Sequence, residues 1–136
     1  MKWITLFVAV LAMLSVPVLY ATGLSWTHRF GQAGPYAIGS TPEKVLEVTV
    51  TNEDARISAA ATGPTYVTDG QLIQYPEKKV VSNSDFVRLN GTADFWVIGQ
   101  DVDTFLGLPF PGTHTFEIEF KEGRVHRIRE RRFFGY

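Results

Sequence analysis

An uncharged apolar run near the N-terminus constrains this chain more than any other feature. Residues 3–21 contain no charged side chain, and a single lysine, Lys2, precedes them. About 20 apolar residues span a bilayer, so the run is just long enough for a transmembrane anchor. The apolar stretch, Pro17 and the small residue Ala21 are also typical of a signal peptide cleaved after Ala21. Both interpretations predict export of the remainder to the periplasmic or extracellular side, because Lys2 keeps the N-terminus in the cytoplasm.

The chain after Ala21 is long enough for one domain with its own hydrophobic core. It contains no cysteine, so neither a disulfide nor a lipid attachment site contributes. The whole chain contains ten Phe, five Tyr and three Trp, and such aromatic residues suit strands. Glycines and a proline interrupt residues 22–40, which predicts an irregular leader or tether. Residues 41–136 are then expected to form a β-rich globular domain.

Alternation and turn signals predict many short strands. The candidate strands are residues 45–51, 66–68, 71–75, 79–81, 86–89 and 93–98. Thr41-Pro42-Glu43 has the form of a helix start, but the alternation that follows favours a strand after at most one turn. The next segment, up to Gly63, fits either a short helix or a strand, and the strand is favoured.

Two dipeptides are typical of tight hairpin turns. Asp69-Gly70 and Asn90-Gly91 each separate two candidate strands. Asn90-Gly91-Thr92 also fits the N-glycosylation pattern, which matters only in a eukaryotic exported protein. So many strands with turns between them predict an all-β domain, a small antiparallel β-sandwich.

The C-terminal hairpin is the clearest expected element. Phe116, Ile118 and Phe120 alternate with acidic residues. A three-residue loop at 121–123 would place Phe116 opposite Ile128, with acids facing bases. In that register His126 lies opposite Ile118 on the apolar face.

Charge is unevenly distributed along the chain. Residues 121–132 carry a net charge of +4, whereas residues 22–120 carry −6. The basic segment could contact anionic lipid, an acidic partner or the acidic body of the same chain. Because no basic, aromatic face extends over the whole domain, nucleic-acid binding is not expected.

Apolar material in one loop and in the C-terminal tail predicts contact surfaces for a protein partner or a membrane complex. The loop residues are Phe105, Leu106, Leu108 and Phe110. The tail residues are Arg127, Arg129, Arg131, Arg132, Phe133, Phe134 and Tyr136. Both segments could alternatively close the hydrophobic core of the domain.

The inventory of reactive side chains is small. Three histidines and no cysteine offer few routes to nucleophilic catalysis or to a zinc site. Asp101 and Asp103 have the spacing of a carboxylate pair at a divalent cation, but no further oxygen donors accompany them, so solvated carboxylates are expected. The sequence therefore predicts no cofactor, no metal and no catalytic residue, and a non-catalytic module is favoured over an enzyme.

Two family resemblances point in different directions. Glu47-Val48-Thr49-Val50-Thr51-Asn52 and Pro111-Gly112-Thr113-His114-Thr115-Phe116-Glu117-Ile118 resemble strands of exported immunoglobulin-like sandwiches, which implies a binding or scaffold module. Phe105-Leu106-Gly107-Leu108-Pro109 and Phe120-Lys121-Glu122-Gly123-Arg124-Val125 are similar to the closing strands of the nuclear-transport-factor-2-like α+β cone. That second resemblance implies a small-molecule-binding or enzymatic domain. Its pocket would be lined by Trp96, Phe116 and Phe120, with Asp94 or Asp101 as base.

Overall fold

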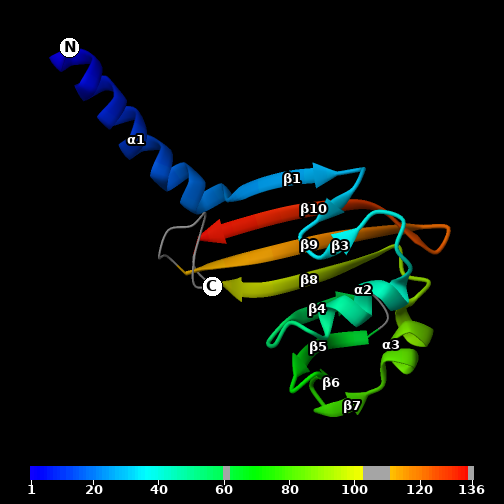
Figure 1. Ribbon diagram of the computed structural model, residues 1–136. Helices are drawn as coiled ribbons and strands as arrows, with labels where there is room; N and C mark the ends of the chain where they lie inside the picture. The colour runs from blue at the N-terminus through cyan, green and yellow to red at the C-terminus, as the bar shows by residue number, and fades with distance from the viewer. Residues whose placement is uncertain (60–61, 103–110, 135–136) are drawn as a thin grey trace.

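A large antiparallel sheet dominates the fold (Figure 1). The computed structural model describes residues 1–59, 62–102 and 111–134, with the backbone alone for 16–22 and 134. In spatial order the eight strands are β1 (Leu24–His28), β10 (Arg124–Phe134), β9 (Gly112–Lys121), β8 (Phe95–Val102), β4 (Arg56–Ala59), β5 (Thr62–Thr68), β6 (Gln71–Gln74) and β7 (Lys79–Val81). The predicted β-rich class is confirmed. The two-sheet sandwich is not, because nearly all strands join one sheet.

The N-terminal apolar run forms helix α1 (Lys2–Thr22), which projects away from the sheet (Figure 1). Large apolar side chains from Trp3 to Leu14 are exposed on it. Among the residues that the structure describes, no helix is long and apolar enough to cross a membrane.

The segment expected as an irregular leader contributes three strands. Strand β1 pairs with β10 at one edge of the sheet, so residues 24–28 belong to the domain itself. Strands β2 (Gln32–Ala33) and β3 (Tyr36–Ala37) form a short ribbon that buries Ala33 and Tyr36. The Tyr36 ring contacts Phe116 of β9 edge-on, with ring centroids 5.0 Å apart.

Two helices complete the layer on this face of the sheet. In α2 (Pro42–Thr49) the Thr41 hydroxyl accepts a hydrogen bond from the amide of Lys44, and Pro42 occupies the first turn. Helix α3 (Asn83–Asn90) begins in the same way at Ser82. Both helices replace expected strands, at 45–51 and 86–89, and Asn90-Gly91 ends α3 instead of turning a hairpin.

Alternate residues along the central strands face the helices and form one side of the hydrophobic core. Ile57, Ile98 and Phe116 lie in register, and Trp96, Ile118 and Ile128 form the next row. All six are almost fully buried beneath α2, α3 and the β2–β3 ribbon. The other predicted strands, including the Asp69-Gly70 hairpin, are confirmed.

The C-terminal hairpin is confirmed, but its register differs from the expected one. Ile118 lies opposite Ile128, and the turn contains two residues, Glu122 and Gly123, both with positive φ. A bulge at His126 absorbs one residue of β10, and its side chain is exposed. The expected place of His126 on the apolar face is therefore wrong.

Candidate functional site

The face of the sheet that points away from α2 and α3 carries the candidate contact surface, called the open face here. It consists of the alternate residues of the strands, and no other described element covers it (Figure 1). One row across it runs from Tyr66 through Arg56, Gly99 and Thr115 to Arg131. The open face is therefore polar and charged, in contrast to the apolar face beneath the helices.

Two adjacent strands carry opposite charges on the open face. Arg127 lies 2.6 Å from Glu119, and Arg129 lies 3.5 Å from Glu117, with each distance joining a guanidinium nitrogen to a carboxylate oxygen. Arg131 approaches Glu117 at 3.9 Å. These pairs are partly exposed and contribute little to stability. Their consequence is electrostatic, because the predicted basic tail is largely neutralised by its own sheet.

The structure divides the predicted contact residues among three places. Arg127, Arg129, Arg131 and Phe133 lie on the open face, where the Arg131 guanidinium packs over the Phe133 ring at 4.9 Å. Arg132 points to the opposite face, beside Glu130. The remaining predicted contacts lie outside the described residues or, for Phe134, outside the described side chains: Phe105, Leu106, Leu108, Phe110, Phe134 and Tyr136.

Two shallow hollows interrupt the open face. One, of about 310 Å³, lies over the paired charges beside the exposed ring of Phe95. The other, of about 280 Å³, lies where Gly99 leaves the middle of the sheet without a side chain. Asp101, expected as a solvated carboxylate, lies at the edge of the second hollow and is exposed, and Asp103 lies outside the described residues.

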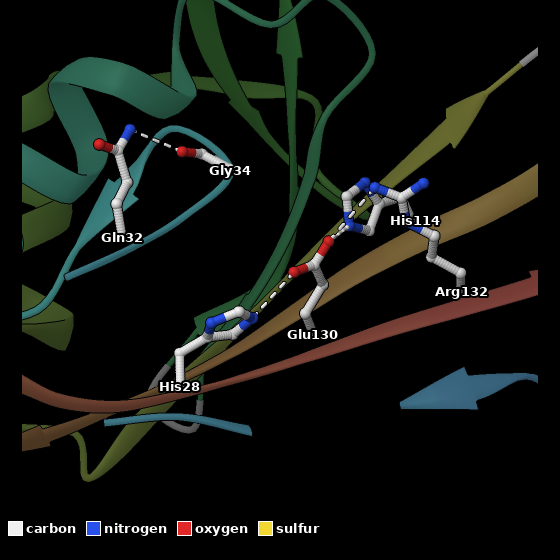
Figure 2. Close-up of polar contacts among 6 residues, drawn as sticks. All are labelled: His28, Gln32, Gly34, His114, Glu130 and Arg132. Atoms are coloured by element: carbon white, nitrogen blue, oxygen red, sulfur yellow. Dashed lines mark hydrogen bonds and ion pairs between the residues drawn. The ribbon is translucent and has the colours of Figure 1, made fainter. Parts of the chain in front are cut away.

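A polar cluster lies on the other face, beyond the part covered by the helices (Figure 2). The carboxylate of Glu130 binds His114 Nε2 at 2.7 Å and His28 Nε2 at 3.0 Å. Arg132 adds a longer contact of 3.4 Å. Three strands supply these groups, because His28 and His114 lie diagonally on either side of Glu130 in the register.

Burial and hydrogen bonding set the charge states in this cluster. Burial lowers the pKa of the His114 imidazole below its ordinary value of 6.5, although the hydrogen bond to Glu130 opposes the shift. Burial would raise the pKa of the Glu130 carboxyl, but hydrogen bonds from His114 and His28 outweigh it and bring the pKa below 4.5. At neutral pH an ionised Glu130 therefore accepts a hydrogen bond from a neutral His114.

The polar cluster has a structural role, because its hydrogen bonds link three strands. Both histidines direct Nε2 to the same carboxylate, and the His114 ring packs on Phe116 with centroids 4.3 Å apart. No group of three residues capable of holding a metal ion occurs among the described residues. The β9–β10 hairpin brings His114 and Glu130 together, whereas His28 joins them only when β1 pairs with β10, a pairing of which the sequence gives no sign.

The pocket expected for a small-molecule-binding cone is filled by side chains. Trp96 lies between Phe86 and Phe120, with edge-on ring contacts of 5.3 and 5.0 Å. Phe116 is covered by Tyr36. Trp96, Phe116 and Phe120 are therefore core residues, and the expected lining of a cavity by these residues is wrong.

No family model, no curated protein and no solved structure matches this chain. The immunoglobulin-like and nuclear-transport-factor-2-like resemblances thus gain no support from known proteins.

Proposed function

We propose that this chain is an exported, non-catalytic binding module that contacts a protein partner through the open face of its sheet. The observation that carries the proposal is the uncovered face itself, which combines paired charges with exposed aromatic surface. Phe95 is 56% exposed there, between Asp94 and the Glu119–Arg127 pair. Aromatic groups within a polar, charge-paired surround are typical of protein interfaces.

The predicted tail contributes to the same surface. Arg127, Arg129, Arg131 and Phe133 extend the open face along β10 towards its end. The Glu–Arg pairs leave this area close to neutral, so it suits a protein surface better than anionic lipid. The loop residues Phe105, Leu106, Leu108 and Phe110 remain proposed contacts.

Export by a cleaved signal peptide is consistent with the boundary between α1 and β1. Helix α1 ends at Thr22, β1 begins at Leu24, and Gly23 between them has a φ of +67°. Cleavage after Ala21 would remove no residue of the sheet. The mature chain would then begin directly before its first strand.

Hydroxyl-radical footprinting tests both parts of this proposal. Phe95 should be oxidised less in the native exported fraction than in the purified protein, because a partner covers it only in the native fraction. Leu89 on α3 is 44% exposed and should react equally in both samples. The N-terminal peptide of the native protein should begin at Thr22.

Equal oxidation of Phe95 in both samples would contradict the contact surface. An N-terminal peptide that still contains residues 1–21 would contradict cleavage. The two results are independent, so each part of the proposal can fail alone.

A further inference from the structure

The hollow at Gly99 has the features of a built site. It lies in the middle of the open face, over β4, β8 and β9. Small residues form its floor and polar or charged residues its rim. Its main lining residues are Asp54, Arg56, Ser58, Tyr66, Asp101 and Thr115.

Gly99 is not explained by the backbone or by packing. Among the described residues, a Cβ at this position would meet only the Thr115 hydroxyl oxygen, at 3.9 Å, and Gly99 lacks the positive φ seen at Gly70 and Gly123. At Gly34, in contrast, a Cβ would come within 2.8 Å of the Phe116 ring. A glycine in a strand interior weakens the strand and often marks the close approach of another molecule. Neither a positive φ nor a close described neighbour therefore requires a glycine at position 99.

The charges around this hollow differ from those elsewhere on the open face. Glu117 and Glu119 are paired with arginines. Asp54, Arg56 and Asp101 form no ion pair with any described residue. Charged donors and acceptors therefore line the rim of this hollow.

We propose that the hollow binds a neutral sugar ring. The two carboxylates accept hydrogen bonds, Arg56 donates them, and the hydroxyl groups of Ser58 and Thr115 do both. A simple cation or a simple anion would meet attractive and repulsive charges side by side, so neither would use the whole rim. Sugar hydroxyls donate and accept at once, which matches this mixed rim.

Tyr66 supplies the apolar part of the site. Its ring borders the hollow and is held edge-on against Tyr75, with centroids 5.2 Å apart. An oriented aromatic ring offers an apolar face together with a polar tip. The C–H face of a sugar would lie against this ring while its hydroxyls reach the rim.

Saturation-transfer difference NMR on the full-length chain tests the proposal, with maltotriose, cellotriose and chitotriose as separate probes. At least one of them should show saturation of its ring protons. Gly99→Val should abolish the signal, because the side chain fills the hollow, and the melting temperature should not fall. Asp101→Asn should weaken the affinity at least about tenfold, because a charged acceptor is lost. Glu77→Gln, at an exposed position between β6 and β7 and outside this hollow, should leave the signal unchanged.

The sugar site rests on the proposed role of the open face as a recognition surface. Its failure can be distinguished from the failure of that proposed role. Absence of signal from all three sugars would overturn it, even if the footprint at Phe95 showed protection. Free lysine, a zwitterion, serves as a further probe. A saturation signal from lysine but from none of the three sugars would also overturn the proposal, since Arg56 and the aspartates would then be pairing with opposite charges. Equal weakening by Asp101→Asn and Glu77→Gln would overturn the location.

Discussion

Glu130 shows how much a single buried carboxylate can organise at the edge of this sheet. It is 9% exposed and joins β1 to β9 through His28 and His114. Its pKa and that of His114 both lie below their ordinary values, so the folded state binds fewer protons than the unfolded state in acid. Stability must then fall as the pH falls.

The pH dependence can be assigned to His114 with one pair of variants. The contribution of His114 is complete above pH 6.5 and is lost as the pH falls through its lowered folded pKa. Glu130 acts in the same direction below pH 4.5. His114→Gln should therefore flatten the profile of unfolding free energy against pH below 6.5, as measured by urea titration. His126→Gln, at the exposed bulge, should leave the profile unchanged.

Glu130→Gln tests the carboxylate in the same assay. Loss of its charge should lower the free energy of unfolding at neutral pH by about 1–3 kcal/mol, the usual range for a hydrogen bond to a charged group. An unchanged stability, or a pH profile of His114→Gln that matches the original protein, would show that the cluster is not ionised as described.

Among the elements, the two short helices show where local and long-range signals compete. Pro42, Val45, Leu46 and Thr49 are buried at helical spacing, and Thr41 provides the cap that the sequence indicates. The alternation of β-branched residues after Val45 favours a strand, and packing against the sheet overrides it. A helix of 8 residues has too few periods for its apolar spacing to be distinguished from alternation.

The strands themselves were easier to predict than their pairing. Turn dipeptides and alternation located β6, β7 and parts of β5 and β8, and predicted the β9–β10 hairpin. The register of that hairpin depends on a bulge at His126, for which the sequence carries no local signal. The place of β1 beside β10 is a long-range pairing and equally lacks one.

Asn90 connects α3 to two strands, and this link gives an element-scale prediction. Its amide nitrogen donates to the Phe86 carbonyl, its amide oxygen accepts from Thr62, and its backbone carbonyl accepts from the Trp96 indole. Asn90→Ala should lower the free energy of unfolding by about 1–3 kcal/mol, because buried partners lose their hydrogen bonds. Thr92→Ala removes the same glycosylation pattern at an exposed position and should change stability little. Equal losses in the two variants, measured in urea, would contradict the structural role of Asn90.

At the scale of the whole molecule, the pairing of distant strands explains why the open face could be predicted only in part from the sequence. The basic residues of β10 were identified from the sequence, and four of the predicted contacts fall on the open face. Their neutralisation by β9 depends on the register, and the Gly99 hollow depends on four neighbouring strands. Neither feature has a signature within any single segment.

The central claim is that a protein partner covers the open face, and site-specific photocrosslinking in the native cells tests it most directly. A benzophenone amino acid placed at Phe95 of the full-length chain should yield one discrete adduct with another protein. The same group at Leu89, exposed on α3, should yield none. Adducts of equal yield from both positions, a product containing only a second copy of this chain, or no adduct from position 95 would contradict the account.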